Sequence, residues 1–434
     1  MDTTLILILL PLLVVFSYLF DSFARKTKFP SVILLILTGL IARALLDAYG
    51  FTPWGALEEI IKVLGTVGLI LIVLEGALEL EITPERIGLL VRGFLAAAVL
   101  LIANVWLVSW ILESFFELQH QAAVIHAIPL SIISSAVAIP AASGFSEKDK
   151  TFVVYESTFS DILGILIFNY AIRQFEAAAP LLGVSPLTTL GVQLIGIIAI
   201  SVGITFVLFK LLQRIKHNVK FFLILSLLIL VYAIGKYLHL PALVTIFIFG
   251  LILSNSNYLL PPFLRKNSPK EQLDKEIASF HMLTAESTFL VRTFFFLFFG
   301  FSISLSSLSS PSTYLFAALL VGAMLLLRFL YFSVSKLSVK PSVLSYHAPR
   351  GLISILLFFQ IKELKSPNFQ SDFIDQNLLL LVILISIGLL LFGTLKPTQA
   401  VVPVEDTNED DLDIEIPDFD TLERDEEDPK KLTP

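Results

Sequence analysis

Long apolar stretches separated by short polar connections occupy residues 1–396 of the chain. A helix that crosses the hydrocarbon core of a membrane needs roughly 20 mostly apolar residues, and about 13 such stretches occur here. They are expected near residues 4–24, 30–48, 61–80, 88–112, 121–143, 151–172, 186–212, 219–236, 240–256, 283–306, 313–335, 343–362 and 377–395. The pattern therefore predicts an all-α polytopic membrane protein.

Basic residues are divided unevenly between the alternate connections. One set carries about 17 Lys and Arg side chains and the other about six, and cytoplasmic connections are the ones enriched in these residues. We therefore expect a multi-pass protein of the plasma membrane with its N-terminus outside and its C-terminus in the cytoplasm. The first stretch lacks a basic leader and a small-residue cleavage site, so it is expected to remain as a helix.

Composition agrees with a membrane location and narrows the chemistry. Of the 434 residues, 56% are hydrophobic and 15% are charged, and none is a cysteine. Disulfides, thiolate metal sites and cysteine nucleophiles are therefore excluded. The net charge of −7 is accounted for by the acidic residues of 397–434. This composition predicts a disordered cytoplasmic tail after a membrane domain at 1–396.

Ionisable residues inside the apolar stretches are few, and two of them lie close together in 151–172. Asp161 lies at the middle of that stretch, and Glu156 precedes it by about one and a half helical turns. Ser157 and Ser160 complete a polar strip, because residues four apart share a helix face. Charge at the bilayer centre costs roughly 2.5 to 3.5 kcal/mol, so such residues are functional candidates. Carboxylate and hydroxyl oxygens suit hard ions, which predicts a monovalent cation at Asp161 and Ser157.

Glu156 also has a structural interpretation, in which it pairs with a buried cation and holds the helices together. Arg350 is the expected partner, because it lies in the apolar stretch 343–362 and needs a counter-charge there. Glu75 and Arg328 are secondary candidates, since their depth in apolar stretches predicts that they are buried.

Two of the apolar stretches contain residues that interrupt helices. Stretch 121–143 carries Pro129 and Pro140 around the pair Ser134 and Ser135, and stretch 343–362 carries Pro349 and Gly351 around Arg350. Unwound backbone at membrane depth is tolerated only where it is buried or lines a cavity, and it marks the binding sites of transporters. The two stretches occupy corresponding places in two halves of opposite topology, which predicts an inverted repeat.

Three motifs in this order resemble the monovalent cation:proton antiporter superfamily over residues 1–396. Glu156-Ser157-Thr158-Phe159-Ser160-Asp161 resembles the Glu-Ser-x-x-Asn-Asp motif of the NhaP-like and sodium/proton exchanger branch. Pro349-Arg350-Gly351 is similar to the Leu-Arg-Gly of that branch, and Leu74-Glu75-Gly76-Ala77-Leu78 is similar to its Phe-Glu-Gly-Gly-Leu. The resemblance implies that Asp161 binds the cation and the proton in turn and that Glu156 pairs with Arg350.

The resemblance also implies an architecture of the NhaA-like antiporter fold, with inverted repeats and crossed, broken helices. A core domain would comprise about 88–172 and 313–395, and a dimerisation domain about 4–80 and 219–306. The sequence departs from the family at two places. Ser134-Ser135-Ala136 replaces the Thr-Asp-Pro of the broken helix and is closer to the Kef-type potassium branch, and Ser160 replaces the Asn. Sodium and potassium therefore remain equal candidates for the transported ion.

These observations favour a secondary antiporter that exchanges Na⁺ or K⁺ for H⁺ by alternating access. One unpaired carboxylate at the site predicts one cation per proton and hence electroneutral exchange. A sodium-coupled solute symporter and a membrane sensor or channel that transports nothing remain alternatives. An enzyme is not expected, because no paired acids, Ser–His arrangement or metal cluster has catalytic spacing. We expect membrane lipid, monovalent cations and protons as partners, a homodimer as the assembly, and neither nucleic acid nor a cofactor.

Overall fold

The computed structural model is helical, with no strand in the part of the chain that it describes. It describes residues 3–27, 30–48, 54–176, 196, 198–210, 221–237, 242–259, 270–303, 311–335, 341–364 and 374–395. The predicted tail at 397–434 lies outside these residues. So does most of the part of the predicted stretch 186–212 that precedes residue 198.

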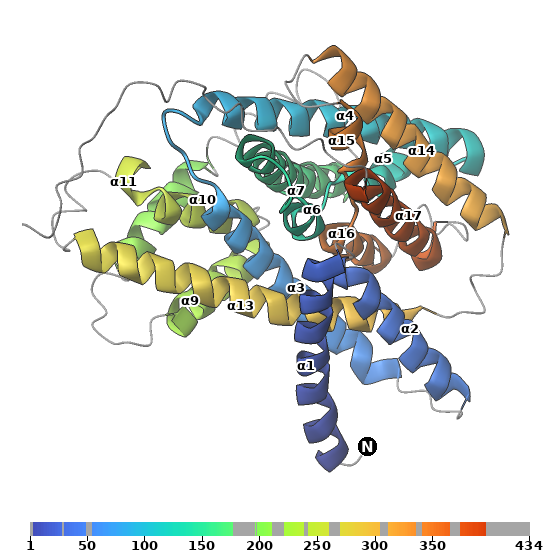
Figure 1. The fold of residues 1–434 in the computed structure, drawn as a ribbon, viewed down its shortest axis with the longest axis horizontal. Helices are drawn as coiled ribbons and strands as arrows, with labels where there is room; N and C mark the ends of the chain where they lie inside the picture. The colour runs from blue at the N-terminus through green and yellow to red at the C-terminus, as the bar shows by residue number, and fades with distance from the viewer. Residues whose placement is uncertain are drawn as a thin grey trace, which may run out of the picture. The chain divides into compact units, whose positions relative to one another are not determined.

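The helices follow the predicted apolar stretches along the chain (Figure 1). Those of the first half are α1 (Thr3–Thr27), α2 (Ser31–Ala48), α3 (Trp54–Glu79), α4 (Ile87–Phe116), α5 (His120–Ser131), α6 (Ser135–Ala141) and α7 (Glu147–Glu176). Residues 198–210 are helical as well. The later helices are α9 (Phe221–Tyr237), α10 (Ala242–Ser254), α11 (Ser256–Leu259), α13 (Lys270–Ser302), α14 (Pro311–Val334), α15 (Pro341–Tyr346), α16 (Leu352–Glu363) and α17 (Gln376–Leu395).

The helices have the length and apolarity of membrane spans. Within the described residues, seven segments are long and apolar enough to cross a membrane, and five shorter apolar helices accompany them. Each predicted stretch contains helical residues, which confirms the all-α polytopic membrane class. The structure differs in the predicted bounds. Helix α13 begins at Lys270 rather than near 283, and stretches 121–143 and 343–362 each form two helices around a break.

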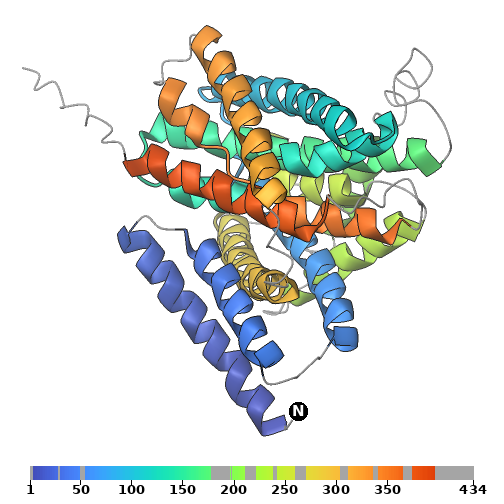
Figure 2. The same cartoon turned by 90° about the vertical axis from the view of Figure 1, so that its right-hand side faces the viewer.

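One group of helices packs around α3 and α13. Helix α13 lies against α2 and α3, α10 lies against α3, and Figure 2 shows α1 and α2, in dark blue, side by side. The closest approach in this group is between α2 and α13. A Cβ atom on Gly39 would collide with the backbone of Leu297 and Phe301, and one on Gly300 would collide with the backbone of Ile36. Backbone therefore rests directly on backbone, which only glycine permits.

A second group packs around α7 and contains the broken helices. Helix α4 lies against α5 and α7, both α5 and α6 lie against α7, and α16 lies against α5. Helix α14 packs on α17, α15 and α4. The two groups meet where α3 contacts α7, at Gly76, whose added Cβ would lie 3.2 Å from the Thr158 methyl group. The polar strip of α7 is thereby surrounded by helices rather than by lipid.

Candidate functional site

The polar strip predicted on residues 151–172 lies in the middle of α7 and is buried. Glu156, Ser157, Ser160 and Asp161 are each at most 4% exposed. Ser157 donates its hydroxyl to the carbonyl oxygen of Val153 at 2.7 Å, which leaves lone pairs on its Oγ. A buried polar strip needs partners, because an unpaired polar group in an apolar interior costs several kcal/mol. The neighbours of the strip therefore define the site.

The first of these neighbours is the break between α5 and α6. Helix α5 ends at Ser131 and α6 begins at Ser135, and two N–H groups at this break face α7. The N–H of Ile133 donates to Ser160 Oγ at 3.0 Å, and the N–H of Ser135 donates to Asp161 Oδ2 at 3.2 Å. The side chains of α7 thus replace the hydrogen bonds that the unwound backbone has lost.

The second break, between α15 and α16, crosses the first. The N–H of Ser134 donates to the carbonyl oxygen of Pro349 at 2.8 Å. A Cβ atom on Gly351 would collide with Oγ and Cβ of Ser134, so the two backbones meet with no side chain between them. The predicted Ser134, Ser135, Ser160 and Asp161 are therefore brought together at this crossing, with Ser157 one helical turn away on α7.

The ion pair predicted between Glu156 and Arg350 is wrong. Glu156 is paired with Arg328 of α14 instead, at 2.6 Å between Oε1 and Nη1 and 2.8 Å between Oε2 and Nη2. Arg328 also donates to the carbonyl oxygens of Leu344 and His347, and its guanidinium lies over the ring of Phe332. Both carboxylate oxygens of Glu156 are used by this bidentate pair, which is the strongest geometry available to a carboxylate. The secondary candidate Arg328 is thus the counter-charge that Glu156 requires.

Comparison with known proteins identifies the family of the chain and solved structures of similar fold. The family model described as "Sodium/hydrogen exchanger, transmembrane" matches residues 11–398. The chain belongs to the sodium/hydrogen exchanger family. Its fold is similar to a structure of the sodium proton antiporter MjNhaP1 from Methanocaldococcus jannaschii at pH 8, with a TM-score of 0.72 and 22% identity over 91% of this chain and 99% of that chain. An electron-microscopy structure of MjNhaP1 gives a TM-score of 0.66 at 22% identity over 90% and 95%. No curated protein matches the sequence.

The candidate site at the crossing of the two breaks has one carboxylate that no base neutralises in the described part of the chain. Asp161 Oδ1 is buried without a hydrogen-bond partner, while Oδ2 accepts the N–H of Ser135. Within the described residues, no three His, Cys, Asp or Glu side chains gather as a metal site would require. The free oxygen of Asp161 can therefore take a proton or contribute to the coordination of a cation, together with hydroxyl and backbone oxygens nearby.

Arg350 of the exchanger is buried at the crossing but bonds to other groups than the sequence predicted. Its Nε donates to the carbonyl oxygen of Leu130 at 2.6 Å, and its Nη1 donates to that of Ala348 at 3.0 Å. Its Nη2 lies 3.1 Å from the sulfur of Met324. The guanidinium therefore closes the end of α5 and fastens it to the second break. No carboxylate contacts it among the described residues.

Glu75, the other secondary candidate, lies where the two helix groups of the exchanger meet. Its Oε2 accepts Nη2 of Arg292 at 3.0 Å, and Nη1 of Arg292 reaches the carbonyl oxygen of Ala136 at 3.4 Å. Arg292 comes from α13, Glu75 from α3 and Ala136 from α6. The ion pair thus touches the half-helix that begins next to Asp161. Sequence reasoning missed this partner, although Glu75 and Glu79 on 61–80 and a lone base, Arg292, on 283–306 were visible in the apolar stretches.

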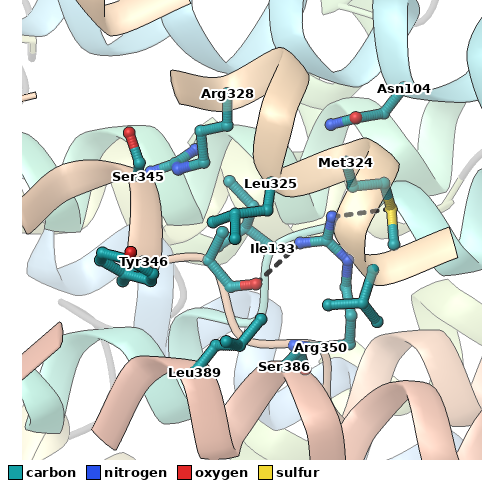
Figure 3. A pocket seen from close by; sticks show the side chains of 12 residues that line it. Asn104, Ile133, Met324, Leu325, Arg328, Ser345, Tyr346, Arg350, Ser386 and Leu389 are labelled. Atoms are coloured by element: carbon teal, nitrogen blue, oxygen red, sulfur yellow. Dashed lines mark hydrogen bonds between the residues drawn. The ribbon is translucent and has the colours of Figure 1, made fainter. Parts of the chain in front are cut away.

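A further residue of the exchanger that sequence reasoning missed is Asn104 on α4. It is 3% exposed, and its Oδ1 has no hydrogen-bond partner. Asn104 lines a cavity of about 20 Å³ beside Arg328 and Arg350 (Figure 3). The signal in the sequence was a lone amide in the middle of the apolar stretch 88–112.

Proposed function

We propose that this exchanger moves one monovalent cation, Na⁺ or K⁺, against one proton, with Asp161 binding each in turn. The proposal is carried by one observation, the buried carboxylate of Asp161 that leaves Oδ1 without a partner. A desolvated charge of this kind is costly unless it is neutralised. A proton or a cation neutralises it, and the two exclude one another. Asp161 therefore serves as the binding group that both transported ions share.

Electroneutral exchange follows from the number of free carboxylates at the crossing of the two breaks. Both oxygens of Glu156 are bound to Arg328, and Glu75 is bound to Arg292, so neither needs a transported ion for neutralisation. Asp161 is then neutral when it carries a proton and neutral when it carries a monovalent cation. The loaded site crosses the membrane without net charge in both directions. Sodium and potassium both meet this requirement, and the serine-rich crossing supports either.

Alternating access requires that the group holding Asp161 moves relative to the rest. We assign this motion to the group formed by α4–α7 and α14–α17, and a dimerisation role to the group formed by α1–α3, α9, α10 and α13. The interface between these two groups contains the contact of Gly76 with Thr158 and the ion pair of Glu75 with Arg292. Assembly as a homodimer in the plasma membrane, with the C-terminus in the cytoplasm, completes the proposal.

The test is cation-dependent proton movement in liposomes. The purified protein is reconstituted with an internal pH dye, a proton gradient is imposed, and sodium, potassium or lithium is added in turn. Each transported cation should dissipate the gradient. Asp161→Asn should abolish the response, because an amide neither takes up a proton nor carries a negative charge that a cation could neutralise. Imposed membrane potentials should leave the rate unchanged.

The matched control is Asp47→Asn, which removes a carboxylate from the exposed pair between Arg43 and Asp47 on α2. Such surface pairs contribute about 0–1 kcal/mol, so this variant should transport like the wild type. Full transport by Asp161→Asn, or no response to any cation by folded wild-type protein, would refute the proposal. The second result would favour a solute symporter or a sensor.

A further inference from the structure

The cavity beside Arg350 has an unusual charge for the interior of a membrane protein. Its polar lining consists of Asn104 of α4, Arg328 of α14, Ser345 and Tyr346 of α15, Arg350 of the second break and Ser386 of α17. Two guanidinium groups thus border one small space, and no carboxylate lines it. Figure 3 shows Asn104 near the end of the Arg350 side chain that contacts Met324. Asp161 does not border this cavity.

The two arginines differ in how their charge is balanced. Arg328 is neutralised by the bidentate contact with Glu156. Arg350 is 3% exposed and contacts only two carbonyl oxygens and a thioether among the described residues. One of these carbonyls, that of Leu130, belongs to the C-terminal end of α5, which carries roughly half a negative elementary charge. Among the described residues, no carboxylate contacts the guanidinium of Arg350 to balance the rest of its positive charge.

The guanidinium of Arg350 also has fewer hydrogen-bond acceptors than it has N–H donors. A guanidinium carries five N–H donors. Three of them have acceptors here, and the Met324 sulfur is a weak one. Asn104 lies in the same cavity with its amide oxygen unbonded. Rotation of the Asn104 amide about its terminal torsion turns the NH₂ group into the cavity in place of the oxygen. In that orientation Asn104 can donate a hydrogen bond to a ligand that lies beside the guanidinium of Arg350.

The size of the cavity restricts what can occupy it. A space of about 20 Å³ holds a single small particle, since one water molecule needs roughly 10–15 Å³ by the same measure. A cation is excluded by the two guanidinium groups. Polyatomic anions such as phosphate and sulfate are excluded by volume. A monatomic anion satisfies both the charge and the size.

We propose that this cavity binds one halide-sized anion, chloride in the cell, between the guanidinium of Arg350 and the amide of Asn104. The anion neutralises the charge that the end of α5 leaves uncompensated. It also links α4, through Asn104, to the crossing of the two broken helices, through Arg350. Chloride is in this proposal a structural ligand of the exchanger and is not transported.

The test compares chloride with gluconate, which is too large for the cavity. Full-length protein is purified in gluconate, chloride replaces gluconate at constant ionic strength, and thermal unfolding is followed by intrinsic fluorescence. The melting temperature should rise with chloride and level off, because a ligand that binds only the folded state stabilises it until the site is saturated. Asn104→Leu, of similar shape, should raise the half-saturating chloride concentration about tenfold or more, since it removes a hydrogen bond to a charged group.

The matched control is Asn169→Leu, which removes an amide from α7 without touching the cavity lining and should keep the wild-type chloride response. Bromide provides a direct view, because its anomalous scattering in a crystal should give a peak between Asn104 and Arg350. Identical melting in chloride and gluconate, or an unchanged chloride response in Asn104→Leu, overturns the proposal. If that variant does not fold, the bromide experiment on the wild type decides, and a cavity without a peak holds only water.

Discussion

At the scale of single residues, the two carboxylates of α7 are almost equally buried but have very different partners. Glu156 is 2% exposed and Asp161 is 4% exposed, and they lie five residues apart on one helix. The difference is in their partners. Glu156 uses both oxygens on Arg328, whereas Asp161 has one backbone N–H and one free oxygen.

A double-mutant cycle should separate the true partner of Glu156 from the predicted one. Glu156→Gln and Arg328→Gln should each destabilise the protein by about 3–5 kcal/mol, because each leaves a buried charge without its counter-charge. The double variant should lose much less than the sum. Glu156→Gln combined with Arg350→Gln should be close to additive. Melting temperatures in detergent provide the measurement, and strong coupling to Arg350 rather than Arg328 would contradict the structure.

Competition at Asp161 predicts a defined pH dependence. A protonated carboxyl cannot bind the cation, so cation binding requires loss of the proton. Below the pKa of Asp161, each pH unit upward raises the deprotonated fraction about tenfold, so the apparent KM for the cation falls about tenfold. Above that pKa the apparent KM levels off. Uptake of a radioactive isotope of the cation into liposomes, with equal pH on both sides, measures this apparent KM. An apparent KM that stays constant from acidic to alkaline pH would exclude a shared site.

At the scale of helices, the crossing of the two breaks depends on the absence of a side chain at residue 351. The backbones of the breaks are joined by the hydrogen bond from Ser134 to Pro349. Gly351 allows this contact because any Cβ there would meet Ser134. The crossing in turn positions the N–H of Ser135 on Asp161. The position of the candidate cation site is therefore coupled to the contact between two half-helices.

Gly351→Ala should consequently reduce transport strongly, by at least about tenfold, because its methyl group separates the breaks and withdraws Ser135 from Asp161. Gly322→Ala on α14 is the matched control, since nothing lies within 4 Å of its added Cβ. Ser134→Gly should partly restore Gly351→Ala by removing the atoms that collide. Liposome exchange rates report the outcome, and equal activity of both alanine variants would mean that the crossing tolerates expansion.

The elements were predicted better than the contacts between them. Helix positions and both breaks follow from local signals, namely apolar stretches of membrane length and the residues Pro129, Pro349 and Gly351. Asp161 was singled out by the cost of burying its charge, and its role in ion binding stays a prediction. The partner of Glu156 did not follow, because Arg328 and Arg350 are both buried bases and only tertiary packing chooses between them. The resemblance of Pro349-Arg350-Gly351 to a family motif favoured the wrong one.

At the scale of the whole molecule, the two helix groups should behave as separate bodies during exchange. The chain has no cysteine, so cysteines that carry spin labels can be introduced in pairs without first removing native ones. Labels at the exposed Leu37 and Met282, on α2 and α13, should keep a constant distance. Labels at Leu37 and the exposed Trp106 of α4 should change distance when a transported cation replaces protons. Pulsed electron resonance in nanodiscs measures both, and a constant distance in the second pair would contradict rocking.

The contact of α2 and α13 through Gly39 and Gly300 has a consequence for how this sequence can evolve. The two glycines are far apart in the chain, yet each faces the backbone of the other helix, so they form a single constraint. A side chain at either position separates the two helices along their contact. No second substitution at the pair can compensate, because glycine is already the smallest residue. Gly88, Gly203 and Gly322 have open space around them and carry no such restriction. Substitutions are therefore tolerated at those three glycines but not at Gly39 and Gly300.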